Sequence, residues 1–454
     1  MRKIFFIGLI LVMLMTACQG PHIQVVSPNV EMQENPLGVA TLAPRFSWQL
    51  SSELTDVVQL SYRIQVAETK DALKREEILV WDSGVVQGDL SLLIPYAGND
   101  LLSGKSYYWR VKVATNHGET SWSEVQHWSM ALSDPSDWQA EWIGEESLSN
   151  AGERAEGDTR LAARYLRKPF ITGKKVQRAM LYVTGLGSYE AYLNGKRVSD
   201  DLFAPTVSWY PERVYYNVYE VTSLLNGKEN MLGVKLGNGR YFGMRGTDTQ
   251  MFGLPRLLAQ LQIEYRDGST ELITSDESWK VTSQGPIIAN NEFDGEEYDA
   301  RLEMKGWNET GFDDSDWKGA DLMAAPGGQL TAQPNPNLQV MEEITPTAIT
   351  CIGDGKYIID MGQNMVGWLQ IHNLIGKKDQ PVTMRFAELL NPDSTLYLAN
   401  LRSAKVTDVY TPSADGPFSW EPSFVYHGFR FVEISGMEEV PQLSHFTGKV
   451  IYDR

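Results

Sequence analysis

The sequence predicts an all-β protein of three consecutive β-sandwich domains behind a signal peptide. Short runs alternate apolar and polar residues, as in "SYRIQVAE" (residues 61–68) and "YYWRVKVAT" (residues 107–115), and this is the period of a strand with one buried face. Gly, Pro and Asn break the chain between such runs, and no long stretch has a helical period. Strands at this spacing favour antiparallel sandwiches.

Length and composition agree with a folded, multidomain chain. The 454 residues are 42% hydrophobic and 22% charged, which leaves room for roughly three globular domains. The formal net charge of −18 would repel phosphate backbones and anionic lipid, so nucleic acid is not an expected partner. The 13 Trp and 20 Tyr are expected to fill sandwich cores, and some of them to form platforms for sugar rings.

Residues 1–18 have the composition of a secretory signal. Arg2 and Lys3 precede an apolar run over residues 4–15, and the segment "MTAC" ends at Cys18. It resembles a bacterial lipobox, in which the cysteine is lipidated and becomes the mature N-terminus. This predicts an exported lipoprotein, periplasmic or on the cell surface, anchored to the membrane at Cys18. The alternative is ordinary signal cleavage. The one other cysteine is Cys351, so a disulfide scaffold is excluded.

The first predicted domain covers residues 21–136. The segments "PRFSWQL", "YYWRVKVAT" and "SWSEVQHW" follow one another with turn-like spacers, and their order resembles a fibronectin type III domain. Tryptophans in such a domain pack in the core and on the sheets. This role is expected of Trp48, Trp109, Trp122 and Trp128.

The second and third predicted domains cover residues 137–326 and 340–454. In the second, Asn194-Gly195 and Asp267-Gly268 predict two-residue hairpin turns of type I′. Near Pro326 the segment "APGGQLTAQPNPN" has the composition of a linker. The third contains the runs "YIIDMGQNMVGWLQI" and "YHGFRFVEISG" and ends on the strand-like "GKVIYDR".

Several motifs together resemble the bacterial α-L-rhamnosidases of glycoside hydrolase family 78. They are "YEAYLNGKRV", "LGNGRYFGMR", "NNEFDGEEYDAR", "GWNETGFDDSDW", "DMGQNMVGW", "RFAELL" and "YHGFRFVEISG". The resemblance implies a jelly-roll or carbohydrate-module-like second domain and a concanavalin-like third domain. It also implies a catalytic (α/α)6 barrel beginning just after the strand that corresponds to "GKVIYDR". The barrel is therefore expected to be absent from this chain, which would be inactive alone.

The acidic residues offer one candidate for catalysis. A glycosidase needs two positioned carboxylates, and "FDGEEYDAR" offers Asp294, Glu296, Glu297 and Asp299. The favoured interpretation is an acidic surface loop with Arg301 balancing part of its charge. No catalytic residue is predicted.

A sugar-binding site is the better candidate. Sugar rings stack on aromatic faces, and their hydroxyls need amide, carboxylate or guanidinium partners. The segments "SWYPER" and "LGNGRYFGMR" supply both kinds of group. The candidate residues are Trp209, Tyr210, Asn238, Arg240, Tyr241 and Arg245, with Phe242 beside them. Many family members read Gly-Asp-Gly-Trp-Tyr where this chain has "GNGRY", and the alternative is a structural turn with packed aromatics.

Metal and docking roles are less marked in the sequence. The six His residues never fall in a zinc-like spacing, no cofactor is expected, and a calcium site with unassigned ligands is the one metal considered. In "DMGQNMVGW", Gly362 and Gly367 are expected at tight backbone positions and Trp368 in the core. Gln363 and Asn364 are expected to face a neighbouring domain.

The predicted function is the accessory half of an α-L-rhamnosidase, which presents substrate and docks against the barrel. By resemblance, the complete enzyme removes terminal α-L-rhamnose from glycans or glycosides by inverting hydrolysis. The expected partners are a rhamnose-containing glycan or glycoside, the membrane through the lipid anchor, and a helical-barrel domain encoded downstream. Two alternatives come from other classes: a stand-alone carbohydrate-binding surface lipoprotein and a structural subunit of a split enzyme.

Overall fold

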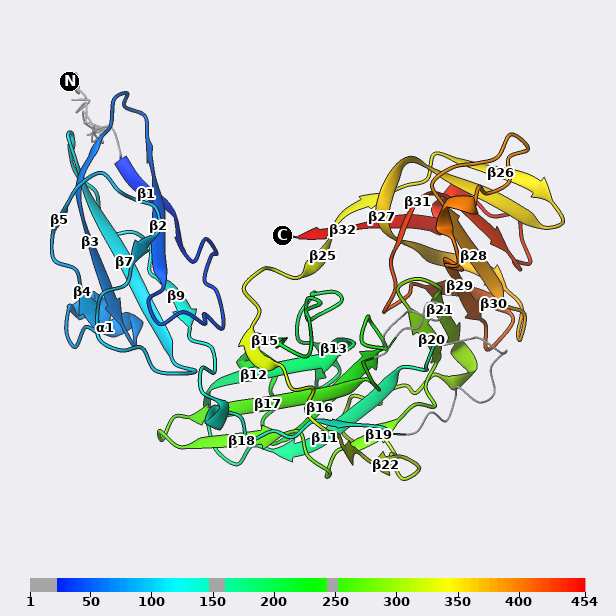
Figure 1. Ribbon diagram of the computed structural model, residues 1–454, viewed down its shortest axis with the longest axis horizontal. Coiled ribbons are helices and arrows are strands. Elements are labelled where there is room, and N and C mark those ends of the chain that lie inside the picture. The colour runs from blue at the N-terminus through cyan, green and yellow to red at the C-terminus, as the bar shows by residue number, and fades with distance from the viewer. Residues whose placement is uncertain (1–22, 147–159, 243–251, 454) are drawn as a thin grey trace, which may run out of the picture. The chain divides into compact units, whose positions relative to one another are not determined.

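The computed structural model describes residues 23–146, 160–242 and 252–453. These residues form two compact units, which divide between Met130 and Ala131 (Figure 1). The predicted all-β class is confirmed. Apart from short 3-10 turns, the described helical structure is α1 (Lys70–Arg75), capped by the Thr69 side chain. None of the described helices has the length and apolar character to span a membrane. The predicted lipidation residue Cys18 and the candidate Arg245 lie outside the described residues.

The first unit consists of two antiparallel sheets around a core rich in tryptophan. One sheet has the order β1 (Ile23–Val30), β2 (Arg45–Ser52), β6 (Ile94–Pro95); the other has the order β4 (Trp81–Asp82), β3 (Gln59–Ala67), β7 (Ser106–Thr115), β8 (Gly118–Glu119), with β5 (Val86–Gln87) on β3 and β9 (Gln126–Ser129) on β7. Trp48, Trp109 and Trp128 are buried in the core, as predicted. Trp122 packs on the sheet, with the Arg110 guanidinium 4.2 Å from its ring centre.

The second unit begins with a sandwich of two sheets. The first has the order β23 (Asp321–Leu322), β10 (Ile143–Gly144), β17 (Arg256–Tyr265), β12 (Val176–Leu186), β15 (Arg213–Glu220), β24 (Gln329–Ala332), with β18 (Thr270–Thr274) on β17. The second has the order β14 (Lys196–Arg197), β13 (Ser188–Leu193), β16 (Glu229–Gly237), β11 (Arg164–Ile171), β19 (Lys280–Thr282), β22 (Lys318–Gly319). Leu181 and Val183 of β12 share one core with Val234 and Leu236 of β16, because alternate residues of each strand point inward.

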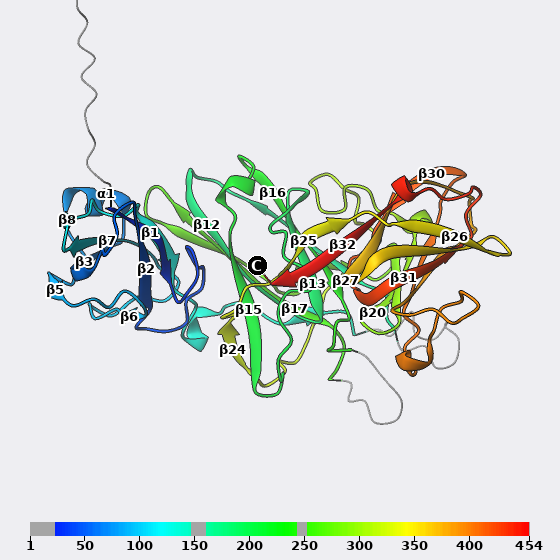
Figure 2. The same cartoon turned by 90° about the horizontal axis from the view of Figure 1, so that it is seen from above.

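A third, larger sheet completes the second unit. Its order is β20 (Ile287–Asn291), β21 (Gly295–Asp299), β29 (Thr407–Thr411), β28 (Val382–Ala387), β31 (His427–Ser435), β27 (Lys356–Gly376), β32 (Phe446–Asp453), β25 (Leu338–Ile344), with β26 (Ala348–Gly353) and β30 (Gly416–Trp420) on β27. The strands β27, β31 and β32 run side by side in both views (Figure 1 and Figure 2).

Strands of the second and third predicted domains are interleaved in space. The hairpin β20–β21 belongs by sequence to residues 137–326, yet β21 pairs in parallel with β29 of the third sheet. After β22 and β23 return to the first sandwich, β24 pairs in parallel with β15. A strand joins the sheet that offers it a free edge, so sequence position alone does not place it.

The two predicted hairpin turns have different outcomes. Asn194 and Gly195 both have positive φ, 53° and 81°, and they join β13 to β14 as predicted. At the second turn only Gly268 has positive φ, 82°. There the Tyr265 N–H bonds to the Ser269 carbonyl, and the Asp267 carboxylate accepts from the Ser269 N–H at 2.9 Å. A three-residue loop ending in a left-handed glycine replaces the type I′ turn.

Candidate functional site

The acidic motif "FDGEEYDAR" lies on the hairpin β20–β21, and each of its carboxylates has a structural partner. Asp294 accepts from the Lys405 backbone N–H at 3.0 Å. Glu297 pairs with Arg160. Asp299 holds Arg301 at 2.6 Å, as predicted. The motif is not the surface loop that the sequence suggested, because Glu296 is fully buried in the strand.

Glu296, on β21 of the third sheet, binds the segment that follows β30. Its carboxylate accepts the backbone N–H groups of Ser423 at 3.1 Å and of Phe424 at 3.0 Å. Burial raises the pKa of Glu296 to about 8, against these two hydrogen bonds and the Lys235 charge, while Asp408 adds to the increase. Asp408 in turn contacts the buried His427 ring nitrogen at 3.0 Å.

We expect folding stability to fall with rising pH because of Glu296. Its pKa is 4.5 when unperturbed and about 8 in the folded protein, so between these values the folded state holds a proton that the unfolded state has lost. The stabilisation is complete below pH 4.5 and disappears as pH rises through about 8. Urea unfolding at pH 6 and pH 9 should show this fall in the wild type and much less of it in Glu296→Gln. Equal pH dependence in both proteins would contradict the assignment, and the exposed Glu277→Gln is the control.

The predicted sugar-binding aromatics come together, but most of their surface is buried. Tyr210 and Tyr241 have ring centres 5.1 Å apart and are 4% and 3% exposed, with Phe252 packed against both. Phe242 is buried as well. Trp209 is the exception: 54% of it is exposed, and its ring meets the Phe252 ring edge-on at 5.5 Å. The ring faces of Tyr210 and Tyr241 therefore pack in the core and leave little surface on which a sugar ring could stack.

The polar members of the predicted set have structural partners too. Asn238 is fully buried, and its amide donates to the carbonyls of Leu161 at 2.9 Å and Asn290 at 2.6 Å. Arg240 is half-exposed and holds Glu292 at 2.6 Å. Trp209 and Arg240 are thus the candidates that present surface to solvent. Sugar binding by this set stays a prediction.

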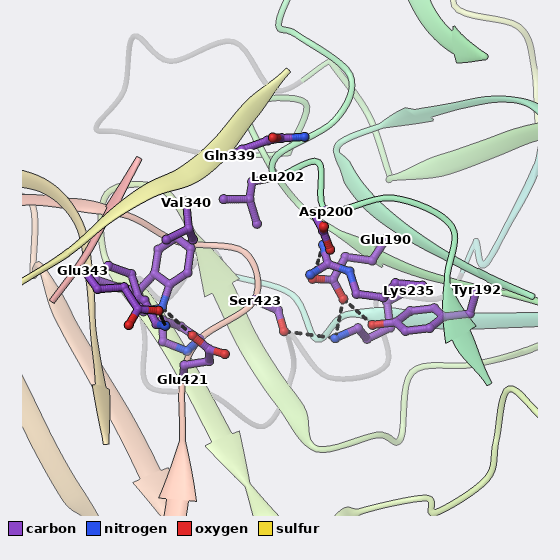
Figure 3. A pocket seen from close by; sticks show the side chains of 14 residues that line it. Glu190, Tyr192, Asp200, Leu202, Lys235, Gln339, Val340, Glu343, Glu421 and Ser423 are labelled. Carbon is purple, nitrogen blue, oxygen red and sulfur yellow. Dashed lines mark hydrogen bonds and ion pairs between the residues drawn. The ribbon is translucent and has the colours of Figure 1, made fainter. Parts of the chain in front are cut away.

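A cleft between the sandwich and the third sheet was not found from the sequence. Its volume is about 530 Å³. The lining residues are Glu190, Tyr192, Arg197, Asp200, Leu202, Lys235, Gln339, Val340, Glu343, Trp368, Glu421, Pro422, Ser423 and Lys449. Figure 3 shows two facing walls, with Glu190, Tyr192 and Lys235 on one and Glu343 and Glu421 on the other.

A buried ion pair forms the first wall. The Lys235 ammonium lies 2.7 Å from Glu190 and 3.0 Å from the Ser423 hydroxyl. Tyr192 donates its hydroxyl hydrogen to the same Glu190 oxygen at 2.5 Å, and Arg197 lies 3.5 Å from the other. Burial opposes both charges, but the Lys235 and Arg197 charges lower the pKa of Glu190, and the Glu190 charge raises the pKa of Lys235. The pair therefore stays ionised.

The second wall combines apolar packing with two carboxylates, Glu343 and Glu421, that each have a partner. Trp368 is buried against Leu202 and Ile451, as predicted for a core residue, and its indole N–H donates to Glu421 at 2.9 Å. Lys449 pairs with Glu343 across the strands β25 and β32.

The sequence held only part of the signal for the first wall. Glu190 and Tyr192 alternate in "YEAYLNGKRV" and so lie on one face of β13. Their cation is Lys235, which lies directly opposite Glu190 on β16. That pairing depends on strand register, which the sequence does not give.

The described residues are 23–146, 160–242 and 252–453. In those ranges, no group of three or more His, Cys, Asp or Glu side chains could hold a metal ion. The expectation of a calcium site stays a prediction.

Three family models match consecutive parts of the chain. Residues 25–134 match the Rha78A-like N-terminal immunoglobulin domain, residues 174–342 the α-L-rhamnosidase N-terminal domain, and residues 350–452 the bacterial α-L-rhamnosidase concanavalin-like domain. Immunoglobulin and fibronectin type III domains share the sandwich architecture expected for the first domain.

Relatives and solved structures agree with these matches. An α-L-rhamnosidase of Alteromonas sp. (strain LOR) is 37% identical over 412 residues, covering 89% of this chain and 44% of that protein. The structure of the α-L-rhamnosidase from Dictyoglumus thermophilum has a TM-score of 0.85 and 36% identity, covering 95% of this chain and 49% of that one. The Streptomyces avermitilis α-L-rhamnosidase, solved with L-rhamnose, has a TM-score of 0.88 and 30% identity, covering 95% and 57%. The chain thus spans about half the length of these relatives.

Proposed function

Since this chain belongs to the bacterial α-L-rhamnosidases of glycoside hydrolase family 78, whose N-terminal β-domains it carries, we propose that these domains are the accessory part of such an enzyme. They would present substrate and dock against the catalytic domain. The complete enzyme would hydrolyse terminal α-L-rhamnose from glycans or glycosides.

One observation carries the accessory role. The four carboxylates of the strongest acidic motif are each committed to a structural contact: Asp294 to Lys405, Glu296 to Ser423 and Phe424, Glu297 to Arg160, and Asp299 to Arg301. A glycosidase acid and base must instead face a shared space that admits the sugar and a water. Asp294 and Glu296 hold the hairpin to segments beside β29 and β30, and Glu297 links it to Arg160, which precedes β11 of the sandwich.

The docking role is supported by a bulge on β27. The pairing of β27 with β31 shifts between Asp360 and Met365, and the intervening Gln363 and Asn364 are exposed. Asn364 donates to Glu388 at 3.1 Å, and Val366 beside it is 46% exposed. A bulge that presents amides next to an apolar side chain suits contact with a neighbouring domain.

We expect the purified chain to leave p-nitrophenyl α-L-rhamnopyranoside intact. Rate enhancement in glycosidases depends on proton transfer and charge stabilisation by groups in fixed geometry, and the acidic motif is occupied by structural contacts. Nitrophenol release would be measured with residues 18–454 beside a no-enzyme control and an active α-L-rhamnosidase. Release above background that survives repurification would contradict the accessory role, and the Asp294 and Glu296 carboxylates would then be the first positions to replace.

A further inference from the structure

The charges that line the cleft of Figure 3 are nearly balanced. The carboxylates are Glu190, Asp200, Glu343 and Glu421, and the cations are Arg197, Lys235 and Lys449. An anionic ligand would meet the four carboxylates and a cationic ligand the three basic groups. A neutral, hydroxyl-rich ligand can donate to the first set and accept from the second. We propose that this cleft binds a neutral sugar ring, at a site separate from the surface around Trp209.

The polar side chains Glu190 and Lys235 of the cleft are held in place by contacts with one another and with their neighbours. The Glu190 side chain is 9% exposed and receives contacts from Tyr192, Arg197 and Lys235. An ammonium group has three N–H donors. In the described part of the chain Lys235 uses two of them, on Glu190 and Ser423, and the third is left for a sugar hydroxyl. Polar groups fixed in advance lower the entropic cost of binding.

The rim offers an acceptor. Asp200 is exposed at the mouth, and within the described residues its carboxylate has neither a hydrogen-bond nor an ion-pair partner. Arg197 lines the same cleft. The Asp200 carboxylate can accept from a sugar hydroxyl, and the Arg197 guanidinium, which also contacts Glu190 and the Asp201 carbonyl, has further N–H donors.

Apolar side chains complete the site. Leu202 lies between Asp200 and Val340 in Figure 3, and Val340 is 36% exposed. These two residues can take the C–H face of a sugar or its methyl group. L-Rhamnose carries a methyl group where L-mannose carries a hydroxymethyl group. The choice of rhamnose rests on the proposed function, whereas the assignment of a neutral sugar does not. The volume of about 530 Å³ lies within the usual range for small-ligand sites.

Titration calorimetry and ligand-observed NMR on the full chain would test the site with methyl α-L-rhamnoside, L-rhamnose and L-mannose. We expect methyl α-L-rhamnoside and L-rhamnose to bind with millimolar dissociation constants and L-mannose to bind more weakly. Asp200→Ala and Arg197→Ala should each weaken binding about tenfold or more, which is the effect of losing one hydrogen bond to a charged group. Val340→Trp, which fills the cleft, should abolish it. The exposed residues Asp316 and Arg266 provide matched controls, Asp316→Ala and Arg266→Ala.

Each outcome decides the assignment. Loss of binding in the cleft variants, with unchanged thermal unfolding and normal binding in the controls, supports it. Binding lost in Trp209→Ala and kept in the cleft variants would move the site to the predicted aromatic surface and overturn the cleft. No heat and no NMR signal with any of the three sugars would also overturn it. Equal binding of L-mannose and L-rhamnose would remove the choice of rhamnose. The accessory role is judged separately, by the hydrolysis assay.

Discussion

Replacing Gly367 with alanine is expected to destabilise the third sheet by about 3 kcal/mol or more. Gly367 lies on β27 where β31 and β32 pair on either side, opposite His427 and Val450. Its φ is +149°, a region that side chains rarely adopt, and an added Cβ would stand 1.7 Å from the Lys449 carbonyl oxygen. That oxygen belongs to backbone, so relief requires β32 to move.

A neighbouring glycine provides the control. Gly428 of β31 pairs with Val366, the residue before Gly367, and a Cβ there meets nothing within 4 Å. Gly428→Ala is expected to change stability by less than about 0.5 kcal/mol. Urea unfolding followed by tryptophan fluorescence, with hydrogen exchange of the β27 and β32 amides, would compare the two variants. Equal midpoints and equal exchange would show that the backbone absorbs the Gly367 methyl group without cost.

The second large effect is expected from Lys235→Met. The change leaves the Glu190 carboxylate buried without its closest cation, and removing one partner of a buried ion pair typically costs about 3–5 kcal/mol. Arg197 lies 3.5 Å away with a side chain 34% exposed, so we expect the lower end of this range. The double variant Lys235→Met with Glu190→Gln should recover most of the loss, because no buried charge remains.

The pH dependence separates this effect from a packing defect. Without Lys235, burial would raise the pKa of Glu190 above its unfolded value, and a protonated Glu190 would be favoured in the folded state. As pH rises from 6 to 8, the single variant should therefore lose more stability than the wild type. The double variant should show no more than the fall that Glu296 already causes. A complete double-mutant cycle of urea unfolding at both pH values gives the coupling. If the single and double variants unfold at the same midpoint and with the same pH dependence, the ion pair has no special role.

The predicted sugar-binding site could be recognised from the sequence only in part. The sequence identified the segments around Trp209 and Tyr241, and the structure does bring Tyr210 and Tyr241 together. Their burial was not predictable, because aromatic side chains serve cores and sugar platforms alike. Gly362 and Gly367 were expected at tight backbone positions, and positive φ values of 81° and 149° confirm this.

The structural features that follow from the sequence alone are local. The alternation of apolar residues determined the strands, and Asn194-Gly195 determined its hairpin, because these signals act between residues a few positions apart. Tertiary structure alone decided which strands meet. It paired β21 with β29 and set Lys235 opposite Glu190, and it brought Ser423 to Lys235 from 188 residues away. Contacts of this kind depend on register and sheet order, and the free energy that selects them comes from burying whole faces rather than from any one residue.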